Sequence, residues 1–194
     1  MRTADVTMPP RPQGFTLIEL MVALAIAALL LMLGVPSFTT FLRNSEIRST
    51  SESIINGLRA ATAEAANRNR KVTFEFASAA SADWSFWFLD DSTDPPTKRI
   101  LQSYSGKEAG LNTNVKKTPG PLLVEFNGLG RVNNPGSGDH IWSIDIESIV
   151  PGEARPLRII VDDSKDPPAG KPRGLRMCDS GLDGLDPPDP RACK

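Results

Sequence analysis

The longest apolar run of the chain lies near its N-terminus, where residues 20–35 (LMVALAIAALLLMLGV) contain no charged or strongly polar side chain. Counted from Phe15 to Val35 the segment has 21 positions, which span roughly 31 Å as an α-helix at about 1.5 Å per residue. The hydrocarbon core of a bilayer is about as thick, and a helix satisfies its own backbone hydrogen bonds in lipid. The run therefore predicts a membrane helix to which the rest of the chain is attached.

The apolar segment contains one acidic residue, Glu19, about one turn inside its start. An ionised carboxylate in hydrocarbon is costly unless it is paired. A secretory signal peptide is cut after its apolar core, whereas a cut after Gly14 would precede the core and leave the helix attached. Such a cut would create an amino terminus at Phe15, and the ammonium group of a neighbouring chain could neutralise Glu19 in an assembly. An ordinary signal anchor with an acidic residue near the membrane interface is the alternative.

Residues 14–19 (GFTLIE), followed by an apolar helix and by Pro36, resemble the class III leader of type IV pilins and pseudopilins. The resemblance implies that a prepilin peptidase cleaves after Gly14 and that the new amine of Phe15 is methylated. It also implies that Glu19 is the acidic position used in subunit docking and assembly.

Four segments are expected along the chain. They are a leader peptide (1–14), a transmembrane or filament-core helix (15–36), an amphipathic half of the same helix (37–70) and a periplasmic β-rich domain (71–194). The second helical segment is predicted from apolar residues at steps of three, four and seven: Phe38, Phe41, Leu42, Ile47, Ile54, Leu58, Ala61 and Ala65. We expect one helix, with a bend, from about Phe15 to about Asn69.

From Lys71 onward the apolar residues alternate with polar ones, which is typical of half-buried strands. Strands are expected over residues 72–76, 84–89, 99–104, 122–126, 141–147 and 157–161. Turns are expected over residues 90–96 and 127–131, the latter because its glycines accept positive φ. Residues 107–119 and 133–139 are expected as surface loops. The predicted fold class is α+β, with one long N-terminal helix packed on a mainly antiparallel sheet.

Later parts of the chain resemble a narrower group. Residues 126–131 (FNGLGR) resemble a mid-domain turn of the GspH/FimT family of minor pilins and pseudopilins, and residues 174–179 (GLRMCD) with 189–193 (DPRAC) resemble the tail of its FimT and FimU branch. The implied function is a structural subunit that assists filament initiation or tip assembly in a type IV pilus. A type II secretion protein H acting in protein export is the alternative. The implied partners are other major and minor pilins or pseudopilins, the prepilin peptidase, and the bacterial inner membrane, crossed once.

The chain has two cysteines, Cys178 and Cys193. In a domain exported to the periplasm they are expected to form a disulfide. The bond would close a loop of about 15 residues at the C-terminus, worth roughly 3 kcal/mol in the chain-entropy model.

The sequence offers little for catalysis, and no catalytic residue, metal or cofactor is expected. His140 is the single histidine, so a Ser-His-Asp triad would depend on it, and a surface position at a strand end is the expected role. One histidine and two cysteines are too few for a Cys-rich zinc site. Aspartates at short spacing could bind Ca²⁺, but they lack the EF-hand pattern and are expected as solvated loops. These clusters are Asp90, Asp91 and Asp94; Asp162, Asp163 and Asp166; and Asp179, Asp183, Asp186 and Asp189.

The formal net charge of −1 argues against a globally basic nucleic-acid binder. A local cluster remains in the C-terminal tail, where five cations could contact the phosphates of double-stranded DNA: Lys171, Arg173, Arg176, Arg191 and Lys194. In the FimT branch such a tail captures DNA through a Gly-Arg-x-Arg motif. Here Leu175 stands where the first motif arginine would be. A DNA receptor at the pilus tip is therefore the second hypothesis, and a structural disulfide that pins the last strand is the other interpretation.

Overall fold

The computed structural model describes residues 14–108, 113–117, 122–133, 143–150, 154–162, 174–183 and 189–193. Internal contacts divide the chain into two compact units, Met1–Thr39 and Thr40–Lys194. Helix α1 (Leu17–Arg68) begins in the first unit and ends in the second, and it continues through Pro36. The single long helix expected from the sequence is thereby confirmed.

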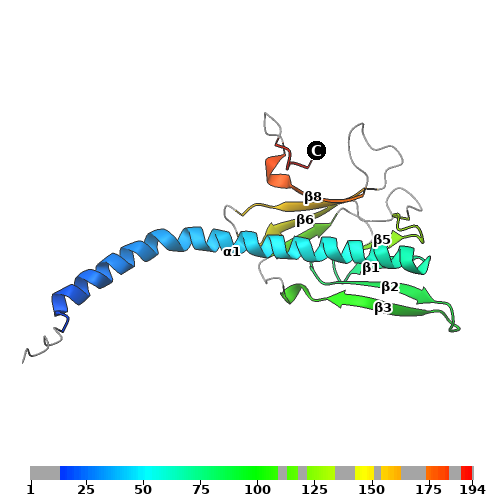
Figure 1. The fold of residues 1–194 in the computed structure, drawn as a ribbon, viewed down its shortest axis with the longest axis horizontal. Coiled ribbons are helices and arrows are strands. Elements are labelled where there is room, and N and C mark those ends of the chain that lie inside the picture. Colours follow the sequence, from blue (N-terminus) through cyan, green and yellow to red (C-terminus); the bar gives the residue numbers. More distant parts are fainter. Residues whose placement is uncertain are drawn as a thin grey trace, which may run out of the picture. The chain divides into compact units, whose positions relative to one another are not determined.

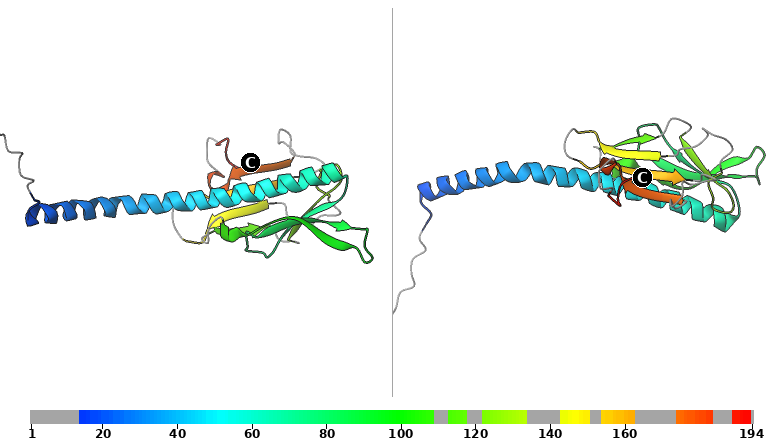
Figure 2. Two further views of the ribbon diagram at one scale, coloured as in Figure 1. Left: turned by 60° about the horizontal axis from the view of Figure 1, so that its bottom comes forward. Right: turned by 90° about the horizontal axis from the view of Figure 1, so that it is seen from above.

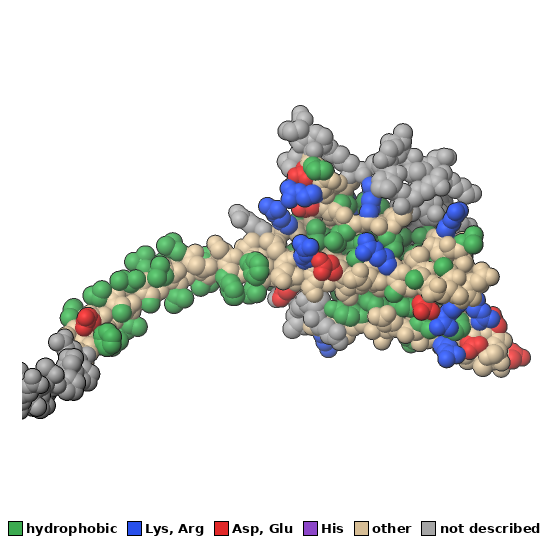
Figure 3. All heavy atoms as spheres, in the orientation of Figure 1, with side chains coloured by type: hydrophobic (Ala, Val, Ile, Leu, Met, Phe, Trp, Pro, Cys, Tyr) green, Lys and Arg blue, Asp and Glu red, His purple; other side chains and the backbone are tan. Residues whose placement is uncertain are grey.

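In the first unit, α1 exposes large apolar side chains along its length, from Leu17 to Val35. Figure 3 shows hydrophobic side chains covering this stretch and an acidic one near its start. The helix is long and apolar enough to cross a membrane, and none of its most apolar stretch is buried within the chain. A helix that is apolar on all sides requires lipid or neighbouring protein around it.

The described part of the second unit contains two antiparallel sheets of four strands (Figure 1). The first sheet has the order β3-β2-β1-β5 and the second β4-β6-β7-β8. The strands are β1 (Val72–Phe76), β2 (Trp84–Asp90), β3 (Thr97–Tyr104), β4 (Thr113–Lys117), β5 (Leu123–Phe126), β6 (Ser143–Ser148), β7 (Leu157–Asp162) and β8 (Gly174–Asp179). Two 3₁₀ turns, η1 (Gly106–Glu108) and η2 (Ser180–Leu182), follow β3 and β8.

All six strands expected from the sequence are present, and the structure divides the strands between two sheets. Residues 113–117, expected within a surface loop, form β4 and pair with β6. Their only large apolar side chain is Val115, which is fully buried, so the segment shows no alternation from which a strand could be predicted. Strand β8 begins at a glycine and was likewise not expected. The turns at residues 90–96 and 127–131 are confirmed, while residues 134–142 lie outside the described ranges.

The C-terminal half of α1 lies over strands of both sheets (Figures 1 and 2). Its buried residues join the aromatic side chains of β1 and β2 and the aliphatic side chains of β4, β6 and β7 in one core. The face predicted from the spacing is buried from Ile47 to Ala65, but it does not extend to Phe38, Phe41 and Leu42, which are exposed. The amphipathic packing of α1 thus begins later than the sequence pattern indicates.

Lys117, at the end of β4, links the second sheet to the β1–β2 connection of the first. Its Nζ donates hydrogen bonds to the carbonyl oxygens of Ser78, Ala79 and Ser81 at 2.9, 3.0 and 2.9 Å. The same ammonium lies 4.1 Å from the centroid of the Phe76 ring. Burial lowers the pKa of Lys117 to about 8. The three carbonyl oxygens and the Phe76 ring compensate for the loss of water around its ammonium group.

Gly57 marks the closest approach of α1 to the first sheet. A Cβ atom added there would lie 2.7 Å from Cη2 of Trp84 and 3.0 Å from Cε2 of Phe74. These two rings stack with their centroids 5.2 Å apart, and the Trp84 ring also stacks on Tyr104 at 5.6 Å. The rings are therefore held from several sides and have little room to move.

Gly57→Ala is expected to lower the free energy of unfolding by about 1 kcal/mol. Alanine gains roughly 1 kcal/mol of helix propensity, but overpacking against two buried rings costs about 1–3 kcal/mol. The measurement is urea unfolding of the full chain in detergent, with Asn56→Ala at the adjacent exposed position as the control. A Gly57→Ala variant as stable as the unchanged chain would contradict this account of the packing.

Candidate functional site

The first candidate site is the start of α1, where Thr16 and Glu19 bond reciprocally. The backbone N–H of Glu19 donates to Oγ1 of Thr16 at 3.2 Å. In return, the backbone N–H and the hydroxyl of Thr16 donate to Oε2 of Glu19 at 3.0 and 3.1 Å. This arrangement is a capping box, which satisfies amide groups that a helix start leaves without partners. This role of Glu19 was not expected from the sequence, although threonine three residues before glutamate and an apolar run is its signature.

The capping box leaves Glu19 available to a second partner. All the hydrogen bonds it receives from described residues go to Oε2, so Oε1 can accept from a neighbouring chain. The positive end of the helix dipole also favours a carboxylate in the first turn. Gly14 and Phe15 precede the helix in non-helical backbone and are exposed, and the Phe15 side chain is 92% exposed. The peptide bond between them is accessible.

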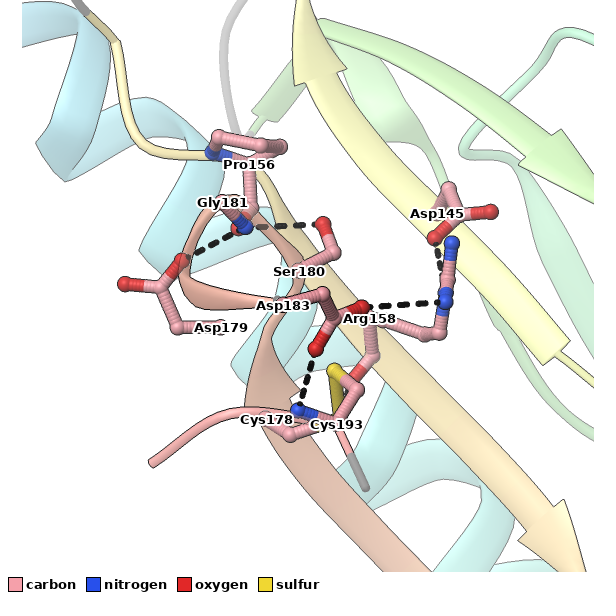
Figure 4. Close-up of a disulfide and its surroundings, with 9 residues drawn as sticks. All are labelled: Asp145, Pro156, Arg158, Cys178, Asp179, Ser180, Gly181, Asp183 and Cys193. Carbon is pink, nitrogen blue, oxygen red and sulfur yellow. Dashed lines mark hydrogen bonds and ion pairs between the residues drawn. A yellow bond between two sulfur atoms is a disulfide. The ribbon is translucent and has the colours of Figure 1, made fainter. Parts of the chain in front are cut away.

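The second candidate site is the C-terminal tail, shown in Figure 4. The expected disulfide between Cys178 and Cys193 is confirmed, with a sequence separation of 15. The end of the chain runs parallel to the end of β8 through a bridge between Asp179 and Ala192. The backbone N–H of Cys193 donates to Oδ1 of Asp183 at 2.8 Å. The tail is therefore held to β8 by covalent and hydrogen bonds.

Arg158 of β7 lies beside the disulfide, opposite Cys178 in the strand register. Its guanidinium pairs with Asp145 of β6 at 2.5 Å and with Asp183 of the tail at 3.5 Å, as Figure 4 shows. The hydrogen bond to Asp145 raises the pKa of Arg158. This network joins β6, β7 and the tail and leaves no net positive charge among its three members.

The structure describes two of the five cations considered for DNA binding. Lys171, Arg173 and Lys194 lie outside the described residues. Arg191 is bound by Asp189 through two hydrogen bonds, from Nε to Oδ1 at 3.0 Å and from Nη2 to Oδ2 at 2.8 Å. The guanidinium holds the pKa of Asp189 at about 2, so the pair is neutral as a unit.

Arg176 of β8 is the other described tail cation. Its Nε is buried and has no hydrogen-bond partner. Of the two described tail cations, Arg191 is therefore paired with Asp189, and DNA binding by the tail stays a prediction.

Two described aspartates of the acidic clusters, Asp90 and Asp179, stabilise turns. Oδ1 of Asp90 accepts hydrogen bonds from the backbone N–H and the hydroxyl of Ser92, and Oδ1 of Asp179 accepts from the N–H of Gly181. Within the described ranges, no three His, Cys, Asp or Glu residues gather closely enough to hold a metal ion. His140 lies outside these ranges.

Comparison with known protein families shows which family has this sequence pattern. A model of the prokaryotic N-terminal methylation motif matches residues 10–35, which include Gly14, Phe15 and Glu19. A model of the type II transport protein GspH matches residues 50–164, more than half of the chain. The chain belongs to the GspH family. No curated protein sequence matches it significantly.

The fold of this GspH-family chain is also that of a solved pilus subunit. It is similar to the crystal structure of the type IV minor pilin FimU from Pseudomonas aeruginosa, with a TM-score of 0.50 and 15% sequence identity. The match covers 69% of this chain and 98% of the FimU chain. At this identity the likeness shows the fold. Family and fold are those of structural pilin subunits, and the apolar helix with the methylation motif fits a membrane-anchored pilin.

Proposed function

We propose that this GspH-family chain is a minor pilin that assists initiation or tip assembly of a type IV pilus. It is made as an inner-membrane precursor with a periplasmic C-terminal domain, cleaved by a prepilin peptidase after Gly14 and methylated at Phe15. The observation that carries the proposal is the start of α1, where an exposed Gly14–Phe15 bond precedes a helix that is capped by Glu19 and apolar from Leu20 to Val35.

The exposed apolar surface of α1 supports assembly with other pilins. Its large side chains between Leu17 and Val35 are exposed, and a patch of this size marks a membrane or protein interaction site. Lipid covers it before assembly and the helices of neighbouring subunits cover it afterwards. The tail disulfide and the likeness to a pilus subunit favour a pilus. The description of the matched family keeps a secretion pseudopilus as the alternative.

Gly14→Ile is expected to abolish leader cleavage, because a branched side chain at the scissile bond blocks the small-residue site. Mass spectrometry of the chain isolated from the native host should then find the uncleaved precursor without methylation at Phe15, and sheared filaments should lack the protein. Gly34→Ile, further along the helix where an added Cβ meets nothing within 4 Å, is the control and should be cleaved normally. Normal processing of Gly14→Ile would refute the proposal.

Deleting the gene separates the two filament systems. Loss of surface pili with protein export intact supports the pilus, whereas loss of export with normal piliation supports the secretion alternative.

A further inference from the structure

A groove of about 610 Å³ lies beside the C-terminal part of α1, within the second unit. Its floor is apolar, with Ala63 and Ala66 from α1, Phe126 from the end of β5, Val132 after the following turn and Leu175 from β8. We call it the α1–β8 groove. Its volume is in the range of clefts that bind ligands or anchor a side chain of a partner.

One wall of the groove is the turn at residues 127–131, which packs against α1. Gly130 has a φ of +70°, and a Cβ there would lie 3.2 Å from Cγ2 of Thr62, so a glycine is needed for the close approach. Asn127 braces the turn, because its Oδ1 accepts from the backbone N–H groups of Leu129 and Arg131 at 3.0 and 3.1 Å. The Leu129 side chain is 75% exposed on this wall. The groove is thus bounded by a hydrogen-bonded turn.

Two arginines line the groove, Arg59 of α1 and Arg131 of the turn. Among the described residues, neither guanidinium has a hydrogen bond or an ion pair. Arg48 and Arg68 on the same helix each pair with a glutamate four residues away, whereas the positions three and four residues from Arg59 are asparagine, isoleucine, threonine and alanine. The groove therefore combines an apolar floor with two arginines that no acidic side chain of the described residues pairs with.

We propose that the α1–β8 groove binds an acidic segment of a neighbouring pilin subunit that carries an apolar side chain. Carboxylates of the segment would pair with Arg59 and Arg131, since guanidinium groups bind carboxylates through two parallel hydrogen bonds. The apolar side chain would cover the floor and exclude water from these pairs. A protein segment fits better than nucleic acid, because a sugar–phosphate backbone does not use an apolar floor. The identity of the neighbour as a pilin rests on the proposed function, but the chemistry of the groove does not.

The first test measures binding of a defined probe to the full chain in a zwitterionic detergent. The probe is a short fluorescein-labelled peptide in which aspartate alternates with leucine, and the readout is fluorescence anisotropy. Arg59→Glu/Arg131→Glu is expected to weaken binding by about tenfold or more, as expected for close charge pairs across an interface. Arg48→Glu/Arg99→Glu, which changes the net charge equally at exposed positions elsewhere, is the matched control and should bind normally.

Charge reversal of the probe sharpens this test. A lysine–leucine peptide should bind the Arg59→Glu/Arg131→Glu variant better than the unchanged chain. The inference is overturned if an asparagine–leucine peptide binds as well as the acidic one, or if reversing the two arginines has no effect. It is also overturned if these arginines are needed for a double-stranded oligonucleotide and not for the peptide.

The second test identifies the occupant in cells of the native host. A photo-crosslinking phenylalanine analogue replaces Ala66, in the floor of the groove, and the crosslinked peptides are identified by mass spectrometry. The same analogue at Asn67, exposed and next in sequence, is the control. We expect Ala66 crosslinks to an acidic segment of another pilin, much weaker from Asn67. Crosslinks only to this chain's own residues, in the same copy or a second one, would overturn the inference. The peptide test does not need a filament. A groove that does not bind the acidic peptide is therefore distinguishable from a chain that is not a pilin.

Discussion

Glu19→Ala is expected to leave leader cleavage intact and to reduce incorporation of the chain into filaments by at least about tenfold. The scissile bond after Gly14 lies outside the capping box, so the peptidase site is not altered. On the proposed docking role, in contrast, the assembled subunit loses the carboxylate that would pair with a neighbouring ammonium in an apolar surrounding. Removing one partner of such a buried pair costs about 2–5 kcal/mol, and each 1.4 kcal/mol is about tenfold in an equilibrium constant. The measurement is the amount of chain in sheared filaments relative to that in the membrane.

Two further variants separate the proposed docking role of Glu19 from its observed role in helix capping. Glu19→Gln retains an oxygen for the backbone N–H of Thr16 and so keeps the capping box, but it removes the charge. Thr16→Ala removes the cap, which costs about 0.5–2 kcal/mol, and keeps the charge. If docking is the role of Glu19, Glu19→Gln fails to assemble as Glu19→Ala does, and Thr16→Ala assembles. The opposite pattern would show that Glu19 acts by capping the helix and that the docking role is wrong.

Replacing both cysteines, as Cys178→Ser/Cys193→Ser, is expected to lower the free energy of unfolding by roughly 3 kcal/mol. The estimate follows from the 15-residue separation of the pair and the entropy of closing a loop of that length. The hydrogen bond from Cys193 to Asp183 is weakened as well, because it depends on the tail staying in place.

The measurement is urea unfolding of the full chain in detergent, with and without reductant. The unchanged chain in reductant should match the double variant, which itself should not respond to reductant. Equal unfolding midpoints for the oxidised chain and the double variant would show that the tail is held by other contacts.

The features that could be predicted before the structure are those carried by neighbouring residues. The apolar run after Phe15 determined a helix exposed on all sides, and the alternation in residues 72–76 determined β1. Residues 14–19 carried the methylation motif, and with two cysteines in an exported domain a single pairing was available. Even the capping box could have been predicted from the sequence, since Thr16 and Glu19 are three residues apart.

How these parts combine depends on contacts that form only in the folded domain. Val115 is one apolar residue among polar ones, and only pairing with β6 and burial over α1 make its segment a strand. Arg158 of β7 pairs with Asp145 of β6 and Asp183 of the tail because the sheet and the closed tail bring these distant residues together. Arg59 of α1 and Arg131 of a distant turn line the same groove only in the folded domain. No local sequence pattern indicates that both arginines lack an acidic partner among the described residues. The periodicity of a segment indicates which of its side chains can be buried. The strands with which it pairs depend on contacts between residues far apart in the chain.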